Sequence, residues 1–187
     1  MKSEEAFILG VVLGDGCLTS REEIGDFTIE FDQKNKEWLE ILSKKFENCF
    51  QKETKVRPTS KGFFRLRIHS KKIFGELQNK IKQFPENLSE ADKNCKINFL
   101  RGMFDSEGSA DKNKFRVRIC SKDDKIINAC KILLNELKIK TGKLDINKKT
   151  EVKSLPINGK DNLIKFQKIV GFTHPEKMKK LNLLISA

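Results

Sequence analysis

Two acidic residues, Asp15 and Glu107, occupy the same place in two similar apolar stretches of the chain. Residues 8–16 read ILGVVLGDG and residues 100–108 read LRGMFDSEG, so each acid follows an apolar run and precedes a glycine. Glycine directly after a helix is the usual stop signal, because it adopts positive φ without a steric penalty. We therefore expect Asp15 and Glu107 at the C-terminal ends of two helices.

Small residues lie four positions apart within both stretches, Gly10 with Gly14 and Gly102 with Ser106. This spacing lets two helix backbones approach closely. If the two helices pack on each other, both carboxylates arrive at one place, where the helix ends add partial negative charge. Carboxylates so placed repel each other unless a cation joins them. The arrangement favours a hard divalent metal ion with oxygen ligands.

Apolar periodicity divides the chain into two halves with the same order of elements. Residues 27–31 and 115–119 alternate apolar and polar side chains, which is typical of strands with one covered face. The sequence predicts an α+β fold of two pseudo-symmetric αββαββα repeats, with saddle-shaped antiparallel sheets covered by helices on one side. The predicted parts are a first repeat at 1–84, a linker at 85–89, a second repeat at 90–171 and a C-terminal helical extension at 172–187.

The helix that carries Glu107 is predicted to begin near Glu90, because the spacing of Ser89 and Asp92 resembles a capping signal. It then continues through apolar positions to Met103.

The uncovered faces of the predicted strands are polar and mostly basic. Strands can enter the major groove of DNA, where arginine pairs with guanine and asparagine with adenine, while lysine mostly holds phosphates. Glu30 and Asp32 interrupt the basic face and either read cytosine or balance charge; alternatively, the alternating charges simply solvate the sheet. The candidate DNA-binding residues are Thr28, Glu30, Asp32, Lys55, Arg57, Arg65, Arg67, His69, Lys114, Arg116, Arg118, Lys143 and Asn147.

The overall charge also points to a polyanionic partner. The chain of 187 residues carries a formal net charge of +12, spread along its whole length. Such a balance predicts a basic surface that binds nucleic acid, although a lysine-rich protein from an AT-rich genome would look similar.

The five cysteines are odd in number and form no C-x-x-C pair, and there are only two histidines, so we expect reduced thiols and no zinc site. No signal peptide and no membrane-spanning stretch are evident. We expect an intracellular protein, cytoplasmic in a prokaryote or in an organelle matrix.

The two acid-ending stretches resemble the LAGLIDADG motif of homing endonucleases, and two copies in one chain resemble the monomeric two-repeat members. Positions one, three, eight and nine of the motif fit in both copies, and Glu107 keeps a carboxylate where the family usually has aspartate. Asp105 aligns with an earlier acid of the motif, but Leu13 fills that place in the first copy, so we expect Asp105 to be structural or a minor helper. The alternative is two ordinary buried helices with acid-glycine ends.

This resemblance implies a monomeric, intron-encoded endonuclease that makes a staggered double-strand break with 3′ extensions at a long asymmetric DNA target. Asp15 and Glu107 would bind Mg²⁺ with help from the backbone carbonyls of Gly14 and Ser106. Mn²⁺ is expected to substitute, and Ca²⁺ to support binding but not cleavage. A freestanding chain without protein-splicing segments favours an intron over an intein origin.

The family also places polar residues at the ends of the matched strands, where this chain has Gln33-Lys34 and Ser121-Lys122. By resemblance, Gln33 positions water, and Lys34 and Lys122 are electrostatic or proton-relay helpers. Ser121 is smaller than Gln33, so the two strands of DNA are expected to be cut at unequal rates if its role differs. Both lysines could instead be phosphate contacts or surface charges.

Neither histidine is expected to be catalytic. His69 is expected to contact DNA, and His174 to lie in the turn before Pro175.

Two other functions use the same scaffold. One is an RNA-binding intron maturase, with or without residual cleavage, and the other is a transcription regulator with an added helix-turn-helix domain. Both motif acids are present, which favours the nuclease.

Overall fold

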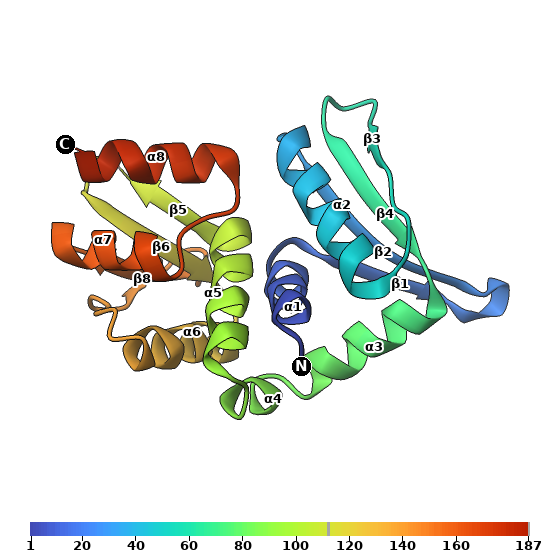
Figure 1. Ribbon diagram of the computed structural model, residues 1–187, viewed down its shortest axis with the longest axis horizontal. Coiled ribbons are helices and arrows are strands. Elements are labelled where there is room, and N and C mark those ends of the chain that lie inside the picture. The colour runs from blue at the N-terminus through green and yellow to red at the C-terminus, as the bar shows by residue number, and fades with distance from the viewer. Residues whose placement is uncertain (112, 187) are drawn as a thin grey trace.

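The computed structural model describes residues 1–111 and 113–186 and divides into two halves of similar build (Figure 1). The predicted order helix, strand, strand, helix, strand, strand, helix is confirmed in both. The first half consists of α1 (Ser3–Asp15), β1 (Cys17–Arg21), β2 (Asp26–Gln33), α2 (Lys36–Phe50), β3 (Val56–Pro58), β4 (Phe64–His69) and α3 (Lys71–Lys82), with a short 3-10 turn, η1 (Glu22–Ile24), between β1 and β2.

The second half repeats this order with slightly shorter strands. It consists of α5 (Lys93–Glu107), β5 (Gly108–Asp111), β6 (Arg116–Ser121), α6 (Asp124–Glu136), β7 (Asp145–Ile146), β8 (Lys153–Asn158) and α7 (Lys160–Ile169). A short helix, α4 (Glu86–Ser89), lies between the halves, and α8 (Pro175–Ser186) follows the second. Among the described residues no helix combines the length and the apolar character that crossing a membrane requires.

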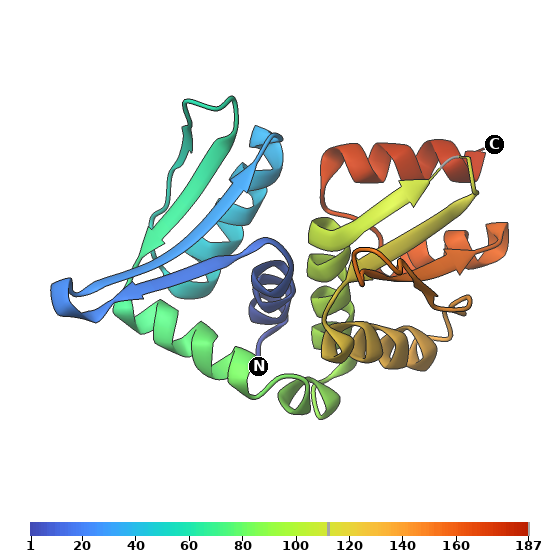
Figure 2. The same ribbon diagram turned by 180° about the vertical axis from the view of Figure 1, so that it is seen from behind.

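Each half contains a four-stranded antiparallel sheet, with the order β1-β2-β4-β3 in the first and β5-β6-β8-β7 in the second. The strand register places Ile29 opposite Ile68 and Phe31 opposite Leu66, and all four side chains are buried. Alternation then sends the polar residues between them to the other face. In Figure 2 the strands of the first sheet lie in front of α2 and those of the second sheet in front of α7, so helices cover the far face of each sheet, as the sequence predicts.

The two halves meet where α1 lies beside α5 at the centre of the molecule (Figures 1 and 2). A methyl group added to Gly10 would collide with the carbonyl oxygen of Phe99 and lie 2.9 Å from the backbone nitrogen of Met103. One added to Gly102 would collide with the carbonyl oxygen of Phe7. The predicted close approach of two helix backbones is therefore confirmed.

The reason given for the glycines after these helices is wrong. Gly16 and Gly108 have φ of −79° and −82°, in the extended region that any residue adopts. Glycine is needed there because of crowding: a Cβ on Gly16 would lie 2.7 Å from Val12 Cα, and one on Gly108 would lie 2.8 Å from Phe104 Cα. The chain thus turns into a strand tightly against the last turn of its own helix.

The predicted start of α5 is also wrong by three residues. The helix begins at Lys93, and its N-cap is Asp92, whose side chain accepts a hydrogen bond of 2.9 Å from the backbone of Cys95. Ser89 instead ends α4, its hydroxyl donating to the carbonyl of Glu86. Of Ser89 and Asp92, the two candidate capping residues, Asp92 is therefore the one that caps α5.

Candidate metal centre and nucleic-acid interface

The C-terminal ends of α1 and α5 touch, and this brings the two motif acids together. A Cβ on Gly14 would lie 2.5 Å from Ser106 Cβ and 3.2 Å from Glu107 Cγ. Asp15 and Glu107 are the last residues of their helices, so both carboxyl groups stand at this contact. The sequence predicted this meeting from the spacing of the small residues.

The two carboxyl groups are partly withdrawn from water and act on each other. Burial raises the pKa of Asp15, against the lowering effects of Lys177 and of a hydrogen bond from Gln33. Burial also raises the pKa of Glu107, and the neighbouring charge of Asp15 raises it further. Negative charge is therefore costly at this place, and a nearby cation would stabilise it.

The donor set fits a magnesium-type ion that also binds substrate. No group of three or more histidine, cysteine, aspartate or glutamate residues that could hold a metal occurs in the part of the chain that the structure describes. Mg²⁺ is usually bound through only one or two carboxylates, with waters and substrate phosphates as the other ligands. Asp15 and Glu107 supply such a pair, with two helix-end carbonyls nearby.

Gln33, at the end of β2, contacts the centre directly. Its amide donates a hydrogen bond of 2.8 Å to Asp15 Oδ2. The family resemblance implies a water-positioning role for this residue, and the structure adds that its amide fixes the orientation of one acid.

Lys177 also reaches the centre, although nothing in the sequence singled it out. It lies on α8, and its Nζ donates to the carbonyl oxygens of Asp105 at 2.5 Å, Ser106 at 2.7 Å and Phe104 at 3.4 Å. The Ser106 carbonyl, expected as a metal ligand, therefore accepts from an ammonium group. A lysine 70 positions downstream of Glu107 carries no local pattern that could have revealed this contact.

Asp105 holds the chain that leads into α8. Its buried carboxylate accepts backbone hydrogen bonds from Thr173 at 2.9 Å and from His174 at 3.0 Å. Burial raises the pKa of Asp105 to about 6, despite these hydrogen bonds. The structural role expected for Asp105 and the position of His174 in the turn before Pro175 are both confirmed.

The other helpers named by resemblance do not contact the two acids through the interactions seen here. Lys34 lies with its Nζ 5.5 Å from the centre of the Phe63 ring. The Ser121 hydroxyl accepts from the backbone of Asp123 at 3.1 Å, so it serves the turn before α6. Lys122 is exposed directly after β6. Their catalytic roles remain predictions.

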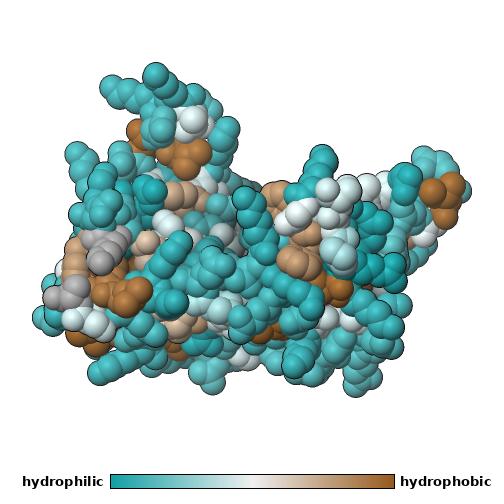
Figure 3. All heavy atoms as spheres, turned by 90° about the horizontal axis from the view of Figure 1, so that it is seen from above, coloured by the Kyte–Doolittle hydropathy of each residue, from teal (hydrophilic) through white to brown (hydrophobic). Residues whose placement is uncertain are grey.

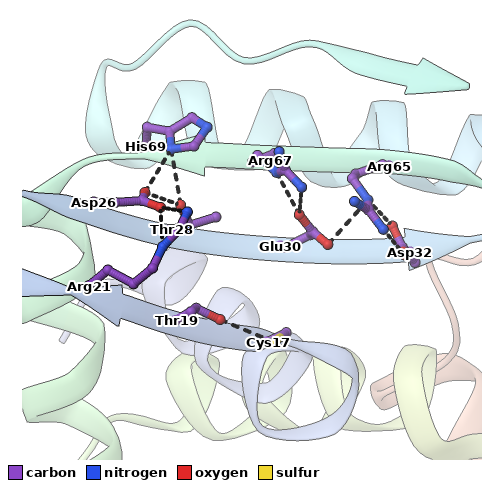
Figure 4. A network of polar contacts seen from close by, with 10 residues as sticks. All are labelled: Cys17, Thr19, Arg21, Asp26, Thr28, Glu30, Asp32, Arg65, Arg67 and His69. Carbon is purple, nitrogen blue, oxygen red and sulfur yellow. Dashed lines mark hydrogen bonds and ion pairs between the residues drawn. The ribbon is translucent and has the colours of Figure 1, made fainter. Parts of the chain in front are cut away.

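On the first sheet, the uncovered face carries a line of ion pairs between neighbouring strands (Figure 4). Arg65 donates to both oxygens of Asp32 at 2.7 and 2.6 Å, and Arg67 contacts Glu30 at 2.5 Å. His69 Nδ1 lies 3.0 Å from the hydroxyl of Thr28. Glu30 and Asp32 therefore balance the charge of two arginines in this structure.

Thr28 is 8% exposed and hydrogen-bonds to His69 and Asp26, and its contact with DNA stays a prediction. An open hollow on the same side is lined by β3, β4 and the segment before them. Its lining is mostly basic, with Lys52, Lys55, Arg57, Arg65, Arg67 and His69, and also includes Glu53, Thr54, Pro58, Thr59 and Ile68.

The second sheet places fewer of the expected residues on its uncovered face. Arg118 donates to the hydroxyl of Ser109 at 3.3 Å. Arg116 lies 3.7 Å from Asp111, and its side chain is only 14% exposed. The two arginines thus have different neighbours from those of the first sheet.

Three expected members of this face lie outside strands, two of them because β7 is only two residues long. Lys114 is in the turn between β5 and β6, and Lys143 precedes β7. Asn147 follows β7, and its side chain accepts from the backbone of Lys149 at 3.0 Å and Thr150 at 3.2 Å. The expected position of Asn147 on a strand is wrong, because its side chain closes a tight turn instead.

Seen from above, the molecule has an outline that is hollowed on one side between two mostly hydrophilic arms (Figure 3). Two sheets side by side, with two acids at the helix contact between them, are the architecture of a two-repeat LAGLIDADG protein.

Comparison with family models agrees with this architecture. Residues 4–82 match the WhiA LAGLIDADG-like domain, and residues 94–171 match a LAGLIDADG-like domain. The two matches fall within the two repeats predicted from the sequence and together span most of the chain. The chain belongs to the LAGLIDADG family.

Solved structures share the fold over nearly the whole chain. The homing endonuclease I-DmoI in complex with DNA and Ca superposes with a TM-score of 0.76 at 22% identity, covering 97% of each chain. Full-length DUF199/WhiA from Thermatoga maritima superposes with a TM-score of 0.68 at 16% identity, covering 99% of this chain and 61% of that one. At these identities the likeness concerns the fold.

Curated relatives come from Methanocaldococcus jannaschii. A glutamine–fructose-6-phosphate aminotransferase is 26% identical over 96% of this chain, and a probable translation initiation factor IF-2 is 28% identical over 96%. This chain spans only 17% and 16% of their lengths. An uncharacterized protein, MJ0314, is 26% identical over 72% of this chain and 54% of its own length.

Proposed function

We propose that this protein is a metal-dependent, site-specific endonuclease that makes a staggered break in double-stranded DNA. The observation that carries the proposal is the contact between the ends of α1 and α5, which places Asp15 and Glu107 together between two sheets with arginines on their uncovered faces. The fold match to I-DmoI, which was solved in complex with DNA and with Mn or Ca, supports the same partner and cofactor class.

The two acids would hold the divalent ion, Mg²⁺ or Mn²⁺, against the scissile phosphates. When bound, such an ion lowers the pKa of a water molecule and stabilises negative charge on the phosphate and the leaving oxygen. Asp15 is kept in one orientation by the amide of Gln33. Because Asp15 and Glu107 come from different halves, each would serve one DNA strand.

The uncovered sheet faces would hold the DNA and read its sequence. Arg65, Arg67 and Arg118 stand on these faces with guanidinium groups suited to guanine or phosphate. The arginines pair with carboxylates in the first half, whereas Arg118 contacts a serine in the second. Two unequal faces favour a long asymmetric target bound by a monomer. The sequence resemblance further implies a role in intron homing.

The proposal is tested by incubating the protein with a library of duplex targets in Mg²⁺, in Ca²⁺ and in a chelator. We expect double-strand cleavage in Mg²⁺ and binding without cleavage in Ca²⁺. Sequencing of the cut ends should give one position with a 3′ extension. Retention of a specific duplex without any cut in Mg²⁺ or Mn²⁺ would contradict the nuclease.

That last result is what a second candidate predicts, namely a DNA-binding protein of this scaffold that does not cut. It is favoured by the match of residues 4–82 to the WhiA LAGLIDADG-like domain. The presence of both acids at the helix contact favours the nuclease over this alternative.

A further inference from the structure

Lys177 caps the helix that carries Glu107. Its ammonium group donates to three successive carbonyl oxygens, those of residues 104, 105 and 106, in the last turn of α5. A positive charge at this end of a helix interacts favourably with carbonyls that have no partner within the helix. The contact also ties α8 to the end of α5.

The same ammonium group lies near both motif acids. Lys177 is half-buried, and it lies close enough to Asp15 and Glu107 for their charges to act on it. The carboxyl groups of residues 15, 105 and 107 and the ammonium group of Lys180 are the other charges that act on it. The ammonium group of Lys177 therefore lies near three acids, Asp15, Asp105 and Glu107, at the centre of the molecule.

The surroundings of the two acids differ. Asp15 accepts from a neutral amide, that of Gln33, at 2.8 Å. On the other side, the carbonyl of Ser106, next to Glu107, accepts from the charged Lys177 at 2.7 Å. The two sides of the centre are therefore unequal, although the helices that carry the acids are related by the internal repeat.

We propose that Lys177 is a positioning residue that supplies positive charge on the Glu107 side of the centre, where it holds the two acids together and competes with a divalent ion for the Ser106 carbonyl. This inference rests on the proposed metal centre. It predicts weaker metal binding on the Glu107 side, because the ammonium group must move before the Ser106 carbonyl can coordinate an ion.

The first test is a double-mutant cycle for thermal stability in the presence of a chelator. We expect Lys177→Met to lower the melting temperature by about 4 °C or more, since two neighbouring acids lose their counter-charge. In a Glu107→Gln background the loss should be less than half as large, and Lys177→Arg should retain most of the stability.

Lys179→Met is the matched control, because Lys179 is an exposed lysine of the same helix. It should leave the melting temperature unchanged in both backgrounds. A loss on Lys177→Met that is equally large in the unchanged and the Glu107→Gln backgrounds would show that Lys177 only caps a helix, and would overturn the charge-balancing role. If the Lys177→Met protein does not fold, the inference requires that the double variant Lys177→Met with Glu107→Gln folds, because removal of one acid lessens the charge repulsion.

The second test measures Mn²⁺ binding directly, from the electron paramagnetic resonance signal of the free ion. We expect Lys177→Met to bind Mn²⁺ severalfold more tightly than the unchanged protein, and Lys179→Met to bind it equally. Equal affinity in the Lys177→Met protein, or no detectable binding in either protein, would overturn the competition with metal. Neither readout depends on DNA cleavage, so failure of the nuclease proposal would be seen separately.

Discussion

Arg67 on β4 and Arg118 on β6 both stand on the uncovered face of a sheet, but they have neighbours of different charge. Arg67 contacts the carboxylate of Glu30, and Arg118 contacts the hydroxyl of Ser109. An exposed ion pair contributes little to stability by itself. Next to DNA, however, removal of Arg67 would leave Glu30 with only Arg65 as a counter-charge among the described residues, so part of its negative charge would face phosphates and base edges. The two arginines should therefore not be equivalent.

We expect Arg67→Ala to weaken duplex binding more than Arg118→Ala does. An arginine that reads a base contributes roughly 1–3 kcal/mol. In the first case Glu30 also loses one counter-charge, keeping Arg65 at 3.2 Å, and adds repulsion. Titration of a labelled target at fixed salt measures both losses. The double variant Arg67→Ala with Glu30→Gln should recover part of the loss; recovery of none would mean that Glu30 does not oppose the DNA.

At this scale the sequence predicted that the two acids meet, because each ends an apolar stretch with small residues at a fixed spacing, and the family resemblance singled out Gln33. It could not identify Lys177 or the partners of Asp105, since these contacts join residues about 70 positions apart and leave no periodicity. Alternation of its neighbours predicts a strand position for Asn147, but its side chain accepts hydrogen bonds from the backbone of Lys149 and Thr150 in a tight turn.

Among the elements, α1 and α5 join the two halves and bring the two acids together. Their contact requires Gly10 and Gly102, at which any side chain would meet the backbone of the other helix. The sequence predicted this contact correctly, because small residues at a helical spacing have few other uses in a buried helix. It gave a wrong reason for Gly16 and Gly108, since crowding by the preceding turn cannot be distinguished from positive φ by residue type alone.

We expect Gly102→Ala to destabilise the protein by roughly 1–3 kcal/mol or more, because the added methyl group collides with the Phe7 carbonyl oxygen. Gly75→Ala is the control: Gly75 lies within α3 and a Cβ there would meet nothing within 4 Å. That change should be neutral or stabilising by about 0.4–1 kcal/mol. Denaturant unfolding compares them, and equal stability of the two variants would contradict the tight helix contact.

For the molecule as a whole, the C-terminal segment breaks the symmetry of the two repeats. It leaves the second half at Gly171, and the His174 ring stacks on Trp38 of the first half, with 5.6 Å between ring centres. Asn35 donates to Glu176 at 3.0 Å, and Lys177 reaches the two acids from the same helix. The sequence predicted an extension without a counterpart in the first half, but its path over the centre depends on long-range contacts.

The central claim is that Asp15 and Glu107 together form one metal-dependent centre for cutting both strands of DNA. It is tested most directly by Asp15→Asn and Glu107→Gln, assayed in Mg²⁺ on a target labelled separately on each strand. We predict that both variants bind the duplex as tightly as the unchanged protein and that neither makes a double-strand break. Cleavage of both strands at the unchanged rate by either variant would contradict the claim.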